Sequence, residues 1–324
     1  MDTLKQNKKL DTPHISAEEY KGKIDFGIIT IKREEFEAVL QRFPAEIELS
    51  GSMNYNLCHV ESFNLHKYNC VVVRSPRQGT NEALKTANSL IQDLEPRWIL
   101  IVGIAGGEPT NDFSLGDVVL SNHIYDLDVT AQLPGGNIEY DINGGPVHNA
   151  VSVVISNLQE RHVLGWNTNS SIIVERPLIN INELIFDDGI DIDWENKIIS
   201  SLKYHFSSSG RVQPKYWDAG IASSNALIRN PDLIRSWKRF ARRIQAVEME
   251  SSGVYTAVRT RTTTYPMLAI RGISDIIGFK RHPSWTDYAC HTAASFAYSF
   301  IMSGPIEERL DTPEKGNEAN INPI

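Results

Sequence analysis

Ionisable side chains at two neighbouring points near the end of the chain could form a site for acid–base chemistry. Glu248 and Glu250 follow one apolar stretch, and Arg271, Ser274 and Asp275 belong to or follow a second one, YPMLAIRG. Carboxyl groups can donate and accept protons during catalysis. If they are buried among Val, Met and small residues, they need polar partners. Ordinary helix capping with a surface ion pair is the simpler alternative, since Ser is common at helix starts.

The segment 246–275 reads as a strand end, a helix, a second strand and a polar turn. Small residues at 251–253 open the predicted helix, and the second strand should end near residue 272. Ligands of open α/β sheets bind outside the carboxyl ends of strands. We therefore expect Arg271, Ser274 and Asp275 just past the carboxyl end of that strand, beside Glu248 and Glu250.

Apolar runs of strand length alternate with amphipathic helices along much of the chain. This alternation predicts an α/β fold with a parallel or mixed sheet covered by helices. The predicted strands are 24–31, 55–64, 68–74, 97–107, 115–132, 170–179 and 217–228, and the predicted helices are 32–43, 152–164, 231–244, 285–303 and one within 75–96.

Composition is that of an ordinary globular protein, with 324 residues, 41% hydrophobic and 22% charged. The net charge of −8 argues against a nucleic-acid groove. Three cysteines without redox or metal spacing suit a reducing compartment. The start has no signal-peptide pattern and no run reaches membrane-span length, so we expect a cytoplasmic protein without membrane contact.

No metal or cofactor motif appears in the sequence: GxSxG, HExxH and CxxC are absent, and the nine histidines show no ligand spacing. We expect one domain over residues 24–303, with an insertion at about 180–214. Residues 1–23 would form a polar arm, and 304–324 a disordered acidic tail.

Four segments together resemble the nucleoside phosphorylase and nucleosidase superfamily. They are VEMESSGVYTA, AIRGISD, FGIITIKREEFEAV, and VGIAGG followed by GDVVLSNHIYDLDVT. The resemblance spans most of the chain apart from the insertion and the ends. It implies a mixed, partly barrel-like central sheet flanked by helices, and a dimer or higher homo-oligomer. The glycine turn expected at VGIAGG, into which the buried strand of segment 97–107 runs, would place the backbone of Ala105 and Gly106 against the ligand.

By position in the matching motifs, the resemblance assigns roles in cleaving an N-glycosidic bond. Asp275 would protonate the departing purine, and Glu35 would activate the attacking water, with Glu34 as the alternative. Glu250 would hold the ribose hydroxyls, with Glu248 beside it in the substrate site.

Three further matches concern the sugar and its orientation. Met249 would pack under the ribose, and Arg271 and Ser274 would orient the acid and the sugar.

Departures from the family pattern favour water over phosphate as the attacking group. Ile101 stands where some phosphorylases of the family carry a phosphate-binding Arg, and TIKREE replaces their GxPxR-like loop. In the base loop SSNALI, Asn225 replaces the usual Asp and Leu227 an aromatic residue. Trp285 or Phe279 could supply the missing ring, although each is more often a packing residue than a base platform.

Basic residues follow the proposed acid, and they could bind the 5′ phosphate of a nucleotide or simply face water. They are Lys280, Arg281 and His282, while Lys32, Arg74 and Arg77 could reach the same cavity. Nucleosidase-like immune effectors that destroy nucleotides such as ATP have a similar EFEAV start. An adenine nucleotide is therefore the expected substrate, with gating by a regulatory partner as one option. A phosphate-dependent phosphorylase and a non-catalytic nucleotide sensor are the alternatives.

Overall fold

The computed structural model describes residues 14–307 except 133, 135–137, 159–162, 164, 169–170, 208–212, 260–262 and 281. The strands are β1 (His14–Ser16), β2 (Phe26–Thr30), β3 (Ile47–Ser50), β4 (Asn54–Glu61), β5 (Lys67–Arg74), β6 (Trp98–Gly107), β7 (Val118–Asp126), β8 (Thr130–Gln132), β9 (Ile138–Tyr140), β10 (Asn143–Pro146), β11 (Tyr216–Ser223), β12 (Ile244–Glu248) and β13 (Met267–Ile276). The helices are the 3₁₀ turn η1 (Ala17–Tyr20), α1 (Arg33–Arg42), α2 (Thr80–Leu94), α3 (Asn149–Ser156), α4 (Ile192–Phe206), α5 (Pro231–Lys238), α6 (Ser251–Ala257) and α7 (Ser284–Met302).

The central sheet is mixed, and one part of it closes on itself. Its order runs β1-β3-β4-β5-β2-β6-β12-β11-β7-β10. Strand β13 pairs with β6 on one side and with β7 on the other, so β6, β12, β11, β7 and β13 form a closed ring. The α/β class and the partly barrel-like sheet expected from the sequence are confirmed.

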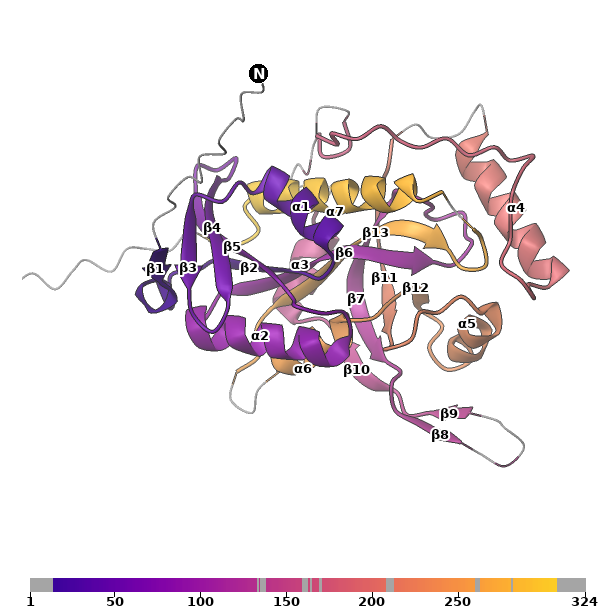
Figure 1. The fold of residues 1–324 in the computed structure, drawn as a ribbon, viewed down its shortest axis with the longest axis horizontal. Helices are drawn as coiled ribbons and strands as arrows, with labels where there is room; N and C mark the ends of the chain where they lie inside the picture. Colours follow the sequence, from indigo (N-terminus) through magenta and orange to yellow (C-terminus); the bar gives the residue numbers. More distant parts are fainter. Residues whose placement is uncertain are drawn as a thin grey trace, which may run out of the picture.

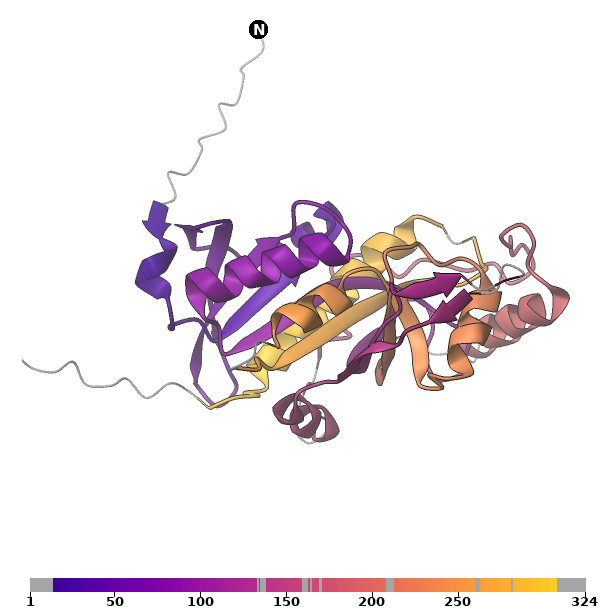
Figure 2. The same ribbon diagram turned by 90° about the horizontal axis from the view of Figure 1, so that it is seen from below.

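Helices cover both faces of the sheet, as Figures 1 and 2 show: α1 and α7 lie on one face, and α2 and α6 on the other. Strand β2 is buried throughout and shows why both faces are apolar. Phe26 and Ile28 pack in the core beneath α1 and α7, whereas Ile29 packs in the core beneath α2. Near-continuous hydrophobic strands are typical of parallel strands covered on both sides.

Two strands extend further than the sequence indicated, which corrects the expected positions of the site residues. Arg271, Ser274 and Asp275 lie inside β13, not past its end, because pairing with β6 resumes after a register shift between Ile273 and Asp275. The expected glycine turn at VGIAGG is likewise part of β6. Its last residues pair with β12 as well as β13, so barrel closure keeps them extended.

The remaining predicted elements are present with one exception, but two predicted helices are shorter in the structure. The helix expected at 231–244 ends at Lys238, because Ile244 already belongs to β12, and the helix expected at 152–164 ends at Ser156.

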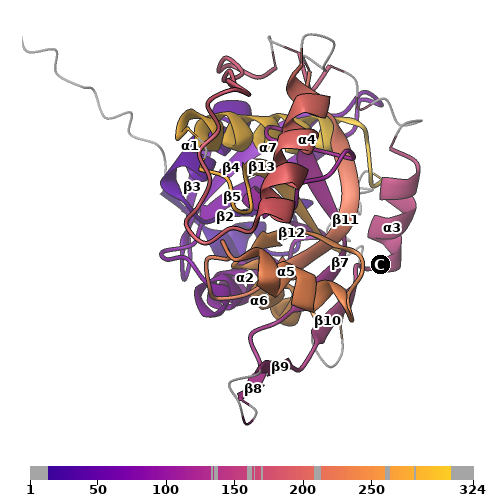
Figure 3. The same cartoon turned by 90° about the vertical axis from the view of Figure 1, so that its right-hand side faces the viewer.

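The expected strand at 170–179 was wrong: its described residues, 171–179, are irregular. The predicted insertion contains α4, which lies at the end of the molecule near α5 (Figure 3). Part of the expected arm forms β1 and η1, with β1 paired to β3. Residues 1–13 of the arm and 308–324 of the predicted tail lie outside the described residues. Within the described chain, no helix combines the length and hydrophobicity needed to span a membrane.

Candidate active site

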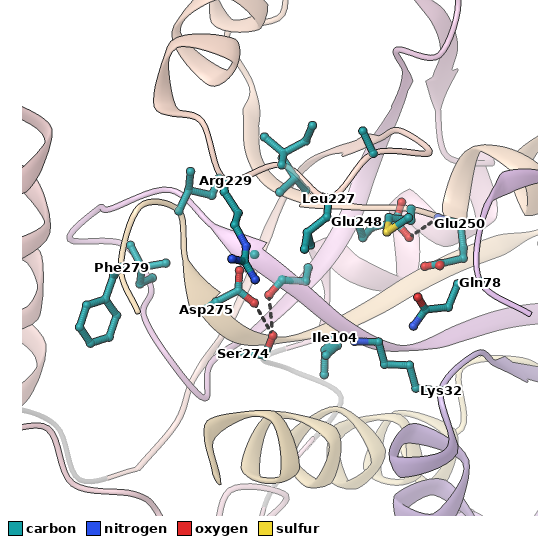
Figure 4. Close-up of a pocket in the computed structure, with 18 of the residues that line it drawn as sticks. Lys32, Gln78, Ile104, Leu227, Arg229, Glu248, Glu250, Ser274, Asp275 and Phe279 are labelled. Carbon is teal, nitrogen blue, oxygen red and sulfur yellow. Dashed lines mark hydrogen bonds between the residues drawn. The ribbon is translucent and has the colours of Figure 1, made fainter. Parts of the chain in front are cut away.

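A cavity of about 490 Å³ opens beside the ring of strands, where β6, β12 and β13 end (Figure 4). Segments from across the chain line it. The lining includes ten residues singled out from the sequence, namely Glu35, Ala105, Gly106, Leu227, Glu248, Met249, Glu250, Ser274, Asp275 and Lys280. The structure thus brings together most of the residues expected to act on one ligand. Arg271 lies fully buried behind the cavity wall, and Arg281 is outside the described residues.

Glu35 is buried and held rigidly by main-chain donors. One carboxylate oxygen, Oε2, accepts hydrogen bonds from the N–H groups of Ile31 and Lys32, at 2.9 and 2.8 Å. The other, Oε1, accepts from the N–H of Ile104 at 3.0 Å. Glu34, the alternative, is exposed and does not line the cavity. Glu35 is therefore the acid that α1 presents to the site.

Arg271 forms a buried ion pair with Glu248 and leaves part of its guanidinium without a partner. Its Nη2 donates to the Glu248 carboxylate and to Ser251 Oγ, and lies 3.8 Å from Glu250. Its Nε and Nη1 have no hydrogen-bond partner among the described residues. Buried donors of this kind are normally satisfied, often by water.

Gly103 explains how Glu35 and Arg271 come close to each other. A Cβ atom added to Gly103 would lie 2.5 Å from Glu35 Oε1 and 2.5 Å from Arg271 Nη1. The absence of a side chain on β6 therefore makes room for both groups. Because both atoms lie 2.5 Å from the same point, Glu35 Oε1 and Arg271 Nη1 are less than twice 2.5 Å apart. A small polar ligand can therefore contact both.

The surroundings of Glu250 alter its protonation. Burial, and then repulsion from Glu248, raise its pKa to about 7, while Arg271 opposes the rise. Its Oε1 accepts a hydrogen bond from the N–H of Gly79 at 3.2 Å. Its carboxyl group can thus be either neutral or charged near pH 7, ready to pair with hydroxyl groups.

Asp275 faces the opposite end of the cavity from Glu250 (Figure 4). Ser274 Oγ donates to its Oδ1 at 2.7 Å, and Ser274 itself is buried. Gly106 is the register partner of Asp275, and a Cβ there would lie 2.8 Å from Asp275 Oδ2. A second glycine of VGIAGG thus makes room for a carboxyl group.

The two base-loop residues that depart from the family pattern, Asn225 and Leu227, have different positions. Leu227 lines the cavity and is largely exposed. Asn225 instead ties the loop down: its backbone N–H and side-chain amide donate to Asp128, and its Oδ1 accepts from Thr80 N–H. Asn225 is therefore placed to shape the loop and does not line the cavity.

Of the two rings suggested as base platforms, only Phe279 lines the cavity. Trp285 is a core residue that packs edge-on against Phe206 and Tyr288. Among the basic candidates, Lys32 and Lys280 line the cavity, while Arg74, Arg77 and His282 do not.

Sequence reasoning did not assign Gln78, Asp187, Ala226 or Arg229, which also line the cavity. Arg229 points toward Asp275 (Figure 4). No local pattern marks Gln78 or Asp187, because they come from loops whose path depends on the packing around them. Ala226 lies within the recognised SSNALI segment and Arg229 follows it directly, so that segment was the available signal for both.

The insertion packs over the Asp275 end of the cavity. Asp187 N–H donates to the Gly278 carbonyl, and Lys280 N–H to the Ile185 carbonyl. From α4, the Trp194 indole N–H donates to the Ile277 carbonyl at 2.8 Å. The segment therefore fixes the wall that contains residues 276–280. Among the described residues, no cluster of His, Cys, Asp and Glu could hold a metal ion.

Comparison with known proteins places this geometry in context. A sequence model of the phosphorylase superfamily matches residues 25–298. An ATP nucleosidase, Cap17, of Escherichia coli strain KTE188 is 26% identical over 72% of this chain and 40% of its own length. A death domain-containing ATP nucleosidase of Amphimedon queenslandica is 19% identical over 68% of this chain and 36% of its own. The chain thus spans about two fifths of these curated relatives.

Solved structures share the fold at low sequence identity. Futalosine hydrolase of Helicobacter pylori superimposes with a TM-score of 0.58 at 17% identity, over 86% of this chain and 97% of its own. The 5′-methylthioadenosine/S-adenosylhomocysteine nucleosidase of the same organism has a TM-score of 0.58 at 18% identity, with the same coverage.

Proposed function

Because the chain belongs to the phosphorylase superfamily, and because its cavity gathers acids from three separate segments, we propose that it hydrolyses the N-glycosidic bond of a purine nucleoside or nucleotide. The expected substrate is an adenine nucleotide, since the curated relatives above are named ATP nucleosidases. The products would be free adenine and the sugar or sugar phosphate.

In this proposal Asp275 is the general acid that assists the departure of the base. Cleavage passes through a sugar with oxocarbenium character, and the base must leave with its negative charge neutralised. Asp275 donates a proton to the purine, and Ser274 orients it through their hydrogen bond. Phe279 and Leu227 supply apolar contacts at this end.

The sugar and the water belong at the other end. Glu250 binds the ribose hydroxyls, and Met249, also on the cavity wall, packs under the ring. Glu35 takes a proton from the attacking water. The unpartnered Nη1 of Arg271 lies close to the same carboxylate, so it can hold that water by donating a hydrogen bond. Glu248 keeps Arg271 in place.

The observation that carries the proposal is the shared cavity of Glu35, Glu250 and Asp275, with Glu35 fixed by three main-chain donors. The test is chromatography for free base after incubation with ATP, AMP, adenosine and methylthioadenosine, each with and without phosphate. We expect adenine from ATP or AMP without phosphate. The Glu35→Gln variant should lose this activity by roughly 10²–10⁴-fold.

Other outcomes would favour other functions. Release only with phosphate would identify a phosphorylase, and would overturn the argument from Ile101, which is buried in β6. Nucleotide binding without base release from any of the four compounds would favour the sensor. Retained activity in Glu35→Gln would remove that residue from the mechanism.

The proposed function also leads to expectations about the localisation, biological role and assembly of the protein. We expect a cytoplasmic nucleosidase with an immune effector role, acting as a homo-oligomer, with activity open to control by a regulatory protein. Sedimentation of the purified chain tests the oligomer, and a single monomeric species would refute it.

A further inference from the structure

Three described cations line the cavity, namely Lys32, Arg229 and Lys280. Arg229 lies beside Asp275, at the end assigned to the base (Figure 4). Lys280 follows Phe279 at the same end, and its ammonium is 3.9 Å from Asp188. Lys32 lies at the other end, near Gln78 and on the side of Glu250. Arg229 and Lys280 therefore belong to the end assigned to the base, and Lys32 belongs to the end assigned to the sugar.

We propose that Lys32 is the residue that selects for a 5′-phosphorylated substrate, with Gln78 as a second polar contact. This inference rests on the proposed function, because that function sets the sugar at the Glu250 end. A sugar held there by its 2′ and 3′ hydroxyls leaves its 5′ substituent among the neighbouring groups of the same end. Lys32 and Gln78 both line that region.

The position of Lys32 is set by the site itself. Its own N–H donates to Glu35 Oε2, and it is the N-cap residue of α1, so its backbone moves with the proposed water-activating acid. The first turn of a helix also favours a nearby anion. Gln78 precedes Gly79, whose N–H donates to Glu250. Both proposed phosphate contacts are thus adjacent to residues already assigned to the site.

Charge explains why a cation is needed at this end. Glu35, Glu248 and Glu250 all line it, and a phosphate group would be repelled by carboxylates. Arg271 is engaged by Glu248 and fully buried. Lys32 is half-buried and, among the described residues, its ammonium has no ion-pair partner. It is therefore the cation available to a 5′ phosphate.

The neighbouring basic residue provides a matched control. Arg33 stands next to Lys32 in the sequence but points away, with an exposed guanidinium paired to Glu37 at 2.6 Å. Removing either residue changes the net charge by the same amount. Only Lys32 should change the recognition of the 5′ group.

The experiment compares AMP with adenosine, by calorimetric dissociation constants and by kcat/KM, in the full chain. In Lys32→Met, the preference for AMP over adenosine should fall about tenfold to hundredfold, as expected for a lost charge-assisted contact. Lys32→Arg should keep most of it. Arg33→Met and Lys280→Met should leave the preference as in the wild-type chain.

The results test the role of Lys32 independently of the proposed hydrolase activity. An unchanged preference in Lys32→Met, or a loss in Lys280→Met instead, would overturn the role of Lys32 while leaving base release intact. A wild-type chain that binds AMP no better than adenosine would also overturn it. If neither compound is cleaved but AMP is bound through Lys32, the hydrolase proposal fails and the inference stands.

Discussion

Glu35 and Arg271 approach each other across Gly103, which carries no side chain to separate them. One comes from α1 near the start of the chain and the other from β13 near its end. Their approach combines a carboxylate held by three main-chain N–H groups with a guanidinium that keeps two N–H groups unpaired. A site for an activated water is the consequence we propose.

Adding a methyl group at Gly103 should therefore abolish activity while the fold survives. In Gly103→Ala the new Cβ would collide with Glu35 Oε1 and Arg271 Nη1. Since both groups must move, we expect base release to fall by at least roughly 10²-fold. The measurement is single-turnover release of adenine. Gly27→Ala is the control, because the three atoms nearest its Cβ would all belong to the flexible Leu90 side chain and not to Glu35 or Arg271. Equal activity of the two variants would argue against the proposed water site.

Removing the acid should impair only substrates whose base needs a proton. Asp275→Asn should lower adenosine or AMP cleavage by about 10²–10⁴-fold. A 7-methyladenine nucleoside already carries a positive charge on its base, so its cleavage should be nearly unaffected. Asp187→Asn, at the same end of the cavity, should change neither rate strongly. An equal loss on both substrates would assign Asp275 a structural role instead.

The buried ion pair should make its single variants much less stable than the double variant. Arg271→Met leaves the Glu248 carboxylate buried without its cation, which should cost about 3–5 kcal/mol. Combining it with Glu248→Gln should recover part of that loss. Urea unfolding measures the free energy. Arg235→Met, which breaks a half-exposed pair with Asp191, should cost less than about 1 kcal/mol. A double variant no more stable than Arg271→Met would contradict this account.

Glu250 should make stability depend on pH in a predictable direction. Its pKa is about 7 in the folded chain against an ordinary value of 4.5, so the folded state holds the proton more tightly. This stabilises the fold fully below about pH 4.5 and is lost as the pH rises through about 7, by about 3 kcal/mol at most. Glu250→Gln removes the dependence. The melting temperature of Glu250→Gln minus that of the wild type should therefore increase from pH 5 to pH 8. A difference that does not change with pH would count against the raised pKa of Glu250.

Local sequence patterns were sufficient for most of the secondary structure and for the choice of acids. The alternation of apolar strands and amphipathic helices indicated the α/β class, because side-chain periodicity follows directly from backbone geometry. Motif resemblance selected Glu35, Glu250 and Asp275, which share one cavity. The pattern failed for 171–179, which is irregular and, apart from Ile172, exposed or half-buried in the structure.

Tertiary structure decided how those residues are presented. Barrel closure keeps Gly103 and Gly106 inside β6, where they admit carboxyl groups, although the sequence indicated a turn. Long-range packing also brought Arg229, Gln78 and the insertion to the cavity, and placed Lys32 and Phe279, which precedes Lys280, at opposite ends of it. The sequence alone determined which chemical groups are available, since types and spacing are local properties. Their mutual distances depend on contacts between segments far apart in the chain, and those contacts exist only in the folded protein.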